Sequence, residues 1–191
     1  MKLQDIEIHN VELLRQKSTP VTSVEEAKEL LDKLKSVLSK HDNGIGLSAI
    51  QIGIPKQVGI IALDGGYREL INASIIDQYD EIIFLGEGCL SFPDLYFDTK
   101  RYNEIVVENY VIDGGNFVRE EFVSLYDQYN IECIAIQHEL DHQIGVIFQD
   151  RQSPKLAPRV KTDNIGRNDP CPCGAKKPNG TPIKYKNCCL K

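Results

Sequence analysis

The stretch His138-Glu139-Leu140-Asp141-His142 contains the residues of this chain whose types and spacing point most directly to chemistry. On an α-helix, residues four apart lie one above the other on the same face. Two imidazoles at that spacing can hold one metal ion, and the glutamate between them can accept a proton from a water on that ion. This H-E-x-x-H pattern is typical of metal-dependent hydrolases, and the alternative is a solvated polar helix face that matches by accident.

The residues around the motif predict a helix with the two histidines on its core-facing side. Solvated histidines would more naturally lie opposite an apolar stripe, whereas here they continue it, which argues against an accidental match. Asn130 and Gly145 are the expected ends of this helix. The stripe consists of Ile131, Ile134, Ala135, His138 and His142.

A third metal ligand is expected elsewhere, because a catalytic metal usually has three protein ligands and one position open for water. Asp141 faces differently from the two histidines, and His9 and His41 have no supporting context. The segment Glu87-Gly88-Cys89-Leu90-Ser91-Phe92-Pro93 is a better source, because glycine permits close backbone approach and a cysteine thiolate can ligate. A buried structural thiol is the alternative for Cys89, and spacing alone leaves the choice open.

A further segment, Gly44-Ile45-Gly46-Leu47-Ser48-Ala49-Ile50-Gln51, places two glycines ahead of a glutamine. Such a segment can present a backbone edge and a side-chain amide beside a reacting carbonyl. A phosphate-binding loop or a plain turn is the alternative, but no Lys-Ser or Lys-Thr pair follows to make a P-loop.

The elements that position these segments predict an α+β domain with mostly antiparallel sheets around the His138 helix. Ser23 and Glu26 have capping-box spacing, which predicts a helix over residues 24–40. Short apolar or alternating runs, bounded by turn residues, predict strands at 58–63, 70–76, 81–85, 104–112 and 117–125, the last two forming a hairpin.

Composition limits the class of protein. The 191 residues, 41% of them hydrophobic, suffice for one core plus an appendage. The N-terminus has no apolar signal region, and no run approaches the ~18 apolar residues of a membrane span, so a cytoplasmic protein without membrane insertion is expected. The net charge of −6 divides into −13 for residues 1–151 and +7 for residues 152–191. A basic tail favours an anionic partner such as RNA or an acidic protein surface, and ordinary solubilising charge is the alternative.

The last part of the chain is expected to bind a second metal. Residues 152–168 are rich in proline and polar residues and are expected to be a linker. In residues 169–191, four cysteine thiolates suit a closed structural zinc site, and such a short segment would need the metal to fold. A disordered tail with incidental cysteines is the alternative. The four are Cys171, Cys173, Cys188 and Cys189.

The tail resembles the SEC-C zinc motif, C-x-C-G followed by K-Y-K-x-C-C, with an apparent insertion at residues 178–182. Insertion into a surface loop need not disturb the ligands. We expect a zinc-folded basic tail to dock on the ribosome or another acidic partner.

The segments GIGLSAIQ (44–51), EGCLS (87–91) and QHELDH (137–142) together resemble peptide deformylase, which carries three such motifs in this order. The resemblance covers about residues 20 to 151, within an expected catalytic domain of residues 1–151. It implies removal of the formyl group from the N-terminal formyl-methionine of nascent polypeptides, with release of formate. The alternatives are a related metal amidohydrolase acting on another N-acyl peptide, or a catalytically silent binding protein.

The resemblance also implies residue roles. Cys89, His138 and His142 would bind Fe2+, for which Ni2+, Co2+ or Zn2+ can substitute. Glu139 would be the general base and acid. The oxyanion would be stabilised by the side-chain amide of Gln51 and the backbone N–H of Leu90. The substrate-binding residues would be Gly46 through its backbone and Ile45, Leu85, Ile131 and Ile134 through an apolar methionine pocket.

The chain departs from the family pattern at two positions near these motifs. Ser48 replaces an alanine, and its small size is expected to be tolerated. Tyr96 stands where many relatives have an arginine, and Arg101 is expected to keep a basic residue near the cleft. Cys133 is expected to be a core residue.

Overall fold

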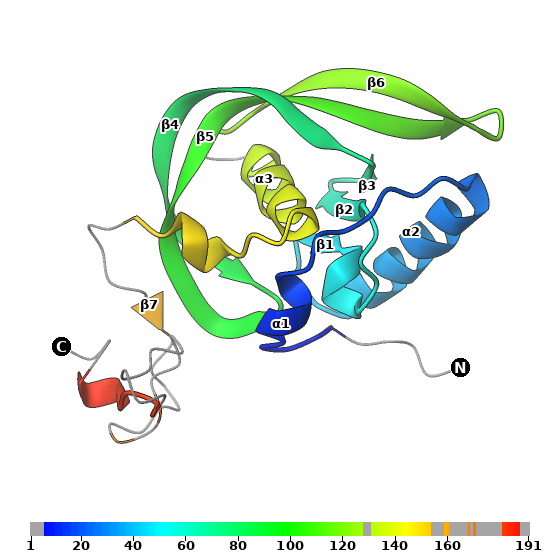
Figure 1. Ribbon diagram of the computed structural model, residues 1–191. Coiled ribbons are helices and arrows are strands. Elements are labelled where there is room, and N and C mark those ends of the chain that lie inside the picture. The colour runs from blue at the N-terminus through cyan, green and yellow to red at the C-terminus, as the bar shows by residue number, and fades with distance from the viewer. Residues whose placement is uncertain are drawn as a thin grey trace.

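In the computed structural model, two antiparallel sheets enclose the helix α3 (Glu132–Gln143) (Figure 1). The structure describes residues 6–127, 131–153, 159–160, 168, 170 and 181–187. The first sheet has the order β1 (Gly46–Ser48), β2 (Val58–Leu63) and β3 (Gly66–Ile71). The second has the order β4 (Ser74–Cys89), β5 (Phe92–Asp113) and β6 (Asn116–Leu125), with β7 (Arg159–Val160) also paired to β5. The predicted α+β class with antiparallel sheets is confirmed.

Helix α2 (Val24–Leu38) covers the first sheet. It begins where the sequence predicts, because the Ser23 hydroxyl accepts a hydrogen bond from the Glu26 backbone N–H at 3.3 Å. It ends two residues before the expected limit, with Ser39 as its C-cap. Its apolar face packs on β1 and β2 and consists of Ala27, Leu30, Leu31, Leu34, Val37 and Leu38. Within the described residues, no helix is long and apolar enough to span a membrane.

The strand predicted at residues 70–76 is wrong, because the chain turns at Asn72. The backbone of Asn72 has a φ of +48°, and its side-chain amide bonds the backbone N–H and carbonyl of Val21. The strand predicted at 81–85 is only the middle of the much longer β4, which is bent by register shifts between Ile75 and Asp77 and between Phe84 and Glu87. The strand predicted at 58–63 is confirmed as β2.

The predicted hairpin of residues 104–125 is confirmed as β5 and β6. Asp113 pairs with Asn116, and the two glycines between them, Gly114 and Gly115, both have positive φ, as a two-residue hairpin loop requires. The second sheet arches over α3 (Figure 1). Its concave face contributes Ile105 and Val107 to the core that packs on α3, where Cys133 is buried as predicted.

Helix α3 is buried on nearly every side, because it contacts β1 and β2 of one sheet and β5 of the other. The side of α3 opposite the histidines is therefore buried as well, whereas the sequence suggested that it would be solvated. Its buried polar residues have partners instead: Gln137, for example, bonds the backbone N–H and carbonyl of Tyr102. The predicted stop is confirmed at Gly145, whose φ is +78°. The helix begins at Glu132 with Ile131 in the N-cap position, so the predicted start at Asn130 is one residue too early.

Part of the expected linker is paired with the body of the protein. Gln152 forms a β-bridge with Thr99, and the Ser153 N–H donates to the Asp98 carbonyl at 2.8 Å. Farther along, β7 pairs with Leu95 and Tyr96 of β5. The four tail cysteines lie outside the described residues. Among the described residues of the tail, Pro170 bridges Lys184, and residues Tyr185–Asn187 form the 3-10 turn η3.

Candidate metal centre and active site

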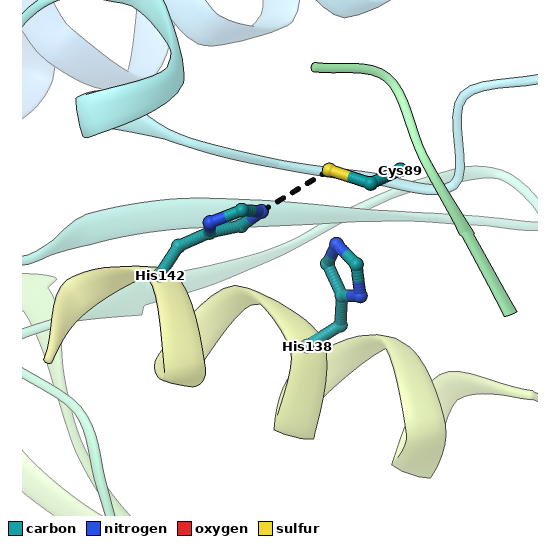
Figure 2. A group of neighbouring side chains, drawn as sticks. All are labelled: Cys89, His138 and His142. Atoms are coloured by element: carbon teal, nitrogen blue, oxygen red, sulfur yellow. Dashed lines mark hydrogen bonds between the residues drawn. The ribbon is translucent and has the colours of Figure 1, made fainter. Parts of the chain in front are cut away.

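Three candidate metal ligands converge between β4 and α3. The ligand atoms of Cys89, His138 and His142 all lie within 4.8 Å of one another. Figure 2 shows both imidazoles reaching from α3 towards Cys89, whose Sγ lies 3.3 Å from His142 Nε2. Cys89 is the last residue of β4, and the histidines are one helical turn apart. The structure thus brings together the three ligands that the resemblance implied.

The surroundings of this cluster fit a bound metal ion. His138 Nδ1 lies 2.6 Å from Glu87 Oε1, which leaves Nε2 as the nitrogen available to a metal. Metal-ligating histidines commonly bond a carboxylate through their other nitrogen in this way. A thiolate with two imidazoles suits a soft or borderline divalent cation. The cluster contains three members among the described residues, so a fourth position would remain open, as in catalytic sites.

Glu139 points into the same site. Its Oε2 is buried and has no hydrogen-bond partner among the described residues. Burial raises the pKa of Glu139 to about 7. The other carboxylate oxygen, Oε1, would lie 2.5 Å from a Cβ added to Gly46. The carboxylate of Glu139 therefore lies directly against the glycine backbone. Buried polar atoms are rarely left without a partner, so this oxygen points to a ligand or water that completes it.

Gln51, in the 3-10 turn η1 (Ala49–Ile52), presents its NH₂ group to the site. The Ser48 backbone N–H donates to Gln51 Oε1 at 2.8 Å and so fixes the orientation of the amide. Gln51 Nε2 then lies 3.6 Å from Cys89 Sγ and 3.3 Å from Ser91 Oγ. Residue 48 contributes its backbone N–H to this contact, while its own hydroxyl is buried without a hydrogen-bond partner among the described residues.

A cavity of about 650 Å³ lies in front of these groups. This volume falls in the usual range for small-ligand sites. Of the residues expected to bind substrate, Gly46 and three apolar ones line it, namely Ile45, Ile131 and Ile134. Leu90, expected to donate its N–H, lines it as well. The cavity is also lined by residues that the sequence did not mark as substrate-binding, namely Ile8, Phe84, Leu95, Tyr96 and Ala135.

Leu85 does not join the residues that line this cavity. It is 59% exposed, and its neighbour Phe84 lines the cavity instead. The strand alternation that would have distinguished the two residues is interrupted by the register shift between Phe84 and Glu87. Short apolar runs in the sequence do not reveal such a shift.

Arg101, expected near the substrate, is instead buried at 2% exposure and is not among the residues that line the cavity. Its Nε and NH2 groups donate to Glu87 at 2.8 and 2.5 Å, and its NH1 group donates to Asp141 at 2.6 Å. Asp141 also accepts from Arg151 at 2.6 Å. A continuous series of ion pairs therefore runs from Arg151 at the surface to His138 in the site. The physical reason for the correction is that Arg101 neutralises two buried carboxylates.

The same contacts keep Glu87 ionised as the partner of His138. Burial alone would raise the pKa of Glu87, but the hydrogen bonds and charges of Arg101 and His138 outweigh it and hold the pKa well below its ordinary value. An ionised Glu87 can accept the Nδ1 proton of His138 and thereby hold the ring in one tautomer and one orientation.

Replacing Arg101 by Met is expected to cost about 3–5 kcal/mol of unfolding free energy, because it leaves Glu87 and Asp141 buried without their cation. Urea unfolding followed by circular dichroism measures the change. Arg119→Met is the matched control, because Arg119 pairs with Glu108 on the exposed face of the sheet, where ion pairs contribute little. Equal losses in the two variants would contradict a central role for Arg101.

Comparisons with known proteins agree with this geometry. Residues 3–157 match the family model described as polypeptide deformylase. The chain is 32% identical over 151 residues to peptide deformylase 2 of Clostridium acetobutylicum, covering 78% of this chain and 95% of that protein. It is 32% identical over 158 residues to the peptide deformylase of Thermotoga maritima, covering 81% and 92%.

Solved structures give the same result. The crystal structure of the Thermotoga maritima peptide deformylase superposes with a TM-score of 0.67 at 29% identity, over 81% of this chain and 100% of that one. That of Arabidopsis thaliana peptide deformylase 1B in complex with an inhibitor superposes with a TM-score of 0.68 at 30% identity, over 79% and 82%.

Proposed function

The chain belongs to the polypeptide deformylase family, whose metal-dependent enzymes remove the N-formyl group from nascent peptides, and we propose that Glu139, Gln51 and the three clustered ligands carry out this hydrolysis here. One observation carries the assignment of roles. A possible metal site, a buried carboxylate without a partner and an oriented amide donor lie at the edge of one cavity. Each of the three has a part in hydrolysing an amide.

Cys89, His138 and His142 would hold the metal. A metal ion held by these three residues would supply Lewis acidity, both towards a water molecule and towards the formyl oxygen. We propose Fe2+ as the ion, with Ni2+, Co2+ or Zn2+ able to substitute, as the family resemblance implies. The thiolate makes the site softer than one built from nitrogen and oxygen alone. The thiolate also makes the site sensitive to oxidation.

The protein's own groups handle the protons and the developing charge. Glu139 accepts the proton of the attacking water and later delivers it to the departing amine nitrogen. When the C–N bond breaks, formate and a free N-terminal amine remain. The negative charge that develops on the formyl oxygen is met by hydrogen bonds from Gln51 Nε2 and the Leu90 backbone N–H. The Ser48 contact fixes the Gln51 amide, so this donor needs no reorganisation during the reaction.

Recognition of the methionine is assigned to the apolar part of the cavity. Ile45, Ile131 and Ile134 provide apolar surface, and the Gly46 backbone is placed to contact an extended peptide. Leu85 is left out of this pocket because of its exposure, and Phe84 takes its place.

Formate release from a formyl-Met peptide, measured with protein purified without oxygen and loaded with iron, tests the proposed function. The rate on an acetyl-Met peptide distinguishes a deformylase from an amidohydrolase with another N-acyl substrate. No formate from the iron-loaded protein would favour the catalytically silent binding protein.

Gly46→Ala is expected to lower kcat/KM for formate release by about 100-fold, because misplacement of a catalytic group by about 1 Å has an effect of this size. The added Cβ would lie 2.5 Å from Glu139 Oε1, so the carboxylate must move. Gly66→Ala is the matched control, since a Cβ there meets nothing within 4 Å. Unchanged activity of Gly46→Ala would contradict the position assigned to Glu139.

For the rest of the chain we propose a zinc-binding tail at residues 169–191, held by Cys171, Cys173, Cys188 and Cys189 and similar to the SEC-C motif. The charge of +7 on residues 152–191 supports a ribosomal or other acidic partner and a cytoplasmic site of action. Residues 1–151 would form the catalytic domain, with residues 152–168 as the linker.

Cosedimentation with ribosomes at low salt tests the tail's role. The truncated form is best ended after Ser153 rather than after Arg151, because Gln152 and Ser153 bond to β5. The full chain should pellet with ribosomes more than residues 1–153 do. Equal pelleting of the two forms would contradict the proposal that the tail binds the ribosome.

A further inference from the structure

Helix α3 lies against β1 and β2 (Figure 1), and two buried polar side chains in this contact have no role so far. Ser48 is 0% exposed and Gln143 is 2% exposed, and neither lines the cavity. The Ser48 hydroxyl and both polar atoms of the Gln143 amide have no hydrogen-bond partner among the described residues. Because buried polar atoms are rarely left unpaired, these three atoms point to a ligand within the contact.

The two side chains face the same space between the first sheet and the helix. Residues two apart in a strand share a face, and a Cβ added to Gly46 would meet Glu139 of α3, so Ser48 faces α3 as well. Directly opposite Ser48, β2 has Gly59, and a Cβ added there would lie 3.5 Å from Gln143 Nε2. Opposite residues of an antiparallel pair direct their side chains to one face, about 5 Å apart. The Gln143 amide therefore lies over the Ser48–Gly59 pair, beside the space that the glycine leaves open.

The chemistry of these groups suits a water molecule. A hydroxyl and a carboxamide can each donate and accept a hydrogen bond, and a buried water typically makes about three such bonds. Both groups are neutral, so an ion between them would find no opposite charge on either. The three unpartnered atoms thus match the hydrogen bonds of a single water molecule.

A water in this place would join the two segments that carry the proposed oxyanion donor and proton acceptor. On one side, the Ser48 backbone N–H holds the Gln51 amide at 2.8 Å. On the other side, Gln143 follows Glu139 by about one helical turn, and a Cβ added to Gly59 would lie 3.8 Å from Glu139 Cβ. The bridge would therefore help to set the position of Gln51 relative to Glu139.

We propose that Ser48 and Gln143 bind one internal water molecule between β1 and α3, and that through it they act as positioning residues for Gln51 and Glu139. The water site stands on the contacts alone, whereas its effect on catalysis rests on the proposed deformylase function. Because neither Ser48 nor Gln143 lines the cavity, the effect should fall on kcat rather than on KM.

A high-resolution crystal structure of the full-length protein tests the water site directly. It should show an ordered water molecule within hydrogen-bond distance of both Ser48 Oγ and the Gln143 amide. A direct hydrogen bond between the two side chains, or an arrangement in which each bonds only to other protein atoms, would overturn the proposal. This measurement does not depend on any variant being able to fold.

A double-mutant cycle of Ser48→Ala and Gln143→Leu tests the bridge through thermal unfolding of the full chain. Each single variant should lower Tm by roughly 2–10 °C, because it leaves the other side chain buried with incomplete hydrogen bonds. The double variant should be no less stable than either single one, since it removes both polar partners together. Additive losses would overturn the bridge. The matched control is Ser39→Ala with Gln78→Leu, the same substitutions at exposed positions in separate elements, whose effects should add.

Formate release from a formyl-Met peptide by the same iron-loaded variants separates positioning from a merely structural role. Ser48→Ala and Gln143→Leu should each lower kcat roughly two- to tenfold at unchanged KM, and the double variant should lose no more than the worse of the two. A lowered Tm with wild-type kcat in both single variants would overturn the positioning role. If the wild type released no formate, the deformylase function would have failed, while the crystal structure and the Tm cycle would still decide the water site.

Discussion

Glu139→Gln is expected to lower kcat for formate release by about 100- to 10,000-fold, the usual contribution of general acid–base catalysis. The substitution keeps the shape of the side chain but removes its ability to accept and return a proton. Glu139 is not among the three clustered ligands, so the catalytic metal should stay bound. The measurement is formate release at saturating peptide, together with the metal content of the same sample.

The control for this prediction is Glu29→Gln, the same substitution on the exposed face of α2. It should leave both kcat and metal content at their wild-type values. Formate release that persists in Glu139→Gln and in Glu139→Ala would refute the role assigned to this carboxylate. A loss of activity accompanied by loss of metal would mean that Glu139 acts by supporting the ligands rather than by moving protons.

The chemistry of the site could be predicted from the sequence because its residues lie in short, contiguous segments. His138 and His142 are brought together by helical geometry alone, and Glu139 accompanies them. Cys89 could be assigned only through the family resemblance, because its approach to α3 depends on the path of β4. Gln51 could be singled out from its own segment, where it follows two glycines. The Ser48 contact that orients its amide is visible only in the structure.

The supporting residues could not be predicted in the same way, because their roles depend on tertiary packing. Arg101 is a cation in an alternating strand, which normally suggests exposure, yet it is buried between Glu87 and Asp141. Asp141 was expected only to face differently from the two histidines, whereas in the structure it is buried and paired with Arg101 and Arg151. The two long strands were predicted as short pieces, since each contains an aspartate at positive φ, Asp80 within β4 and Asp94 within β5.

Cys89→Ala is expected to remove the catalytic metal and, with it, formate release. The thiolate is one of three protein ligands, and even changes to residues that only support a ligand weaken metal affinity by about 10- to 100-fold. Elemental analysis of the full chain should find two metal ions per molecule in the wild type, one in each proposed site. The variant should hold one, in the cysteine-rich tail.

Cys133→Ala separates this effect from the loss of a thiol in general. Burial raises the pKa of Cys133 to about 11, so its thiol is neutral and lies in the core against the carbonyls of Tyr102 and Asn103. Its removal should lower the free energy of unfolding but leave the metal content and kcat unchanged. A Cys89→Ala protein that kept both its second metal ion and its activity would show that another residue supplies the third ligand. Loss of the metal from Cys89→Ala alone would instead establish the thiolate as the group that completes the His138–His142 site.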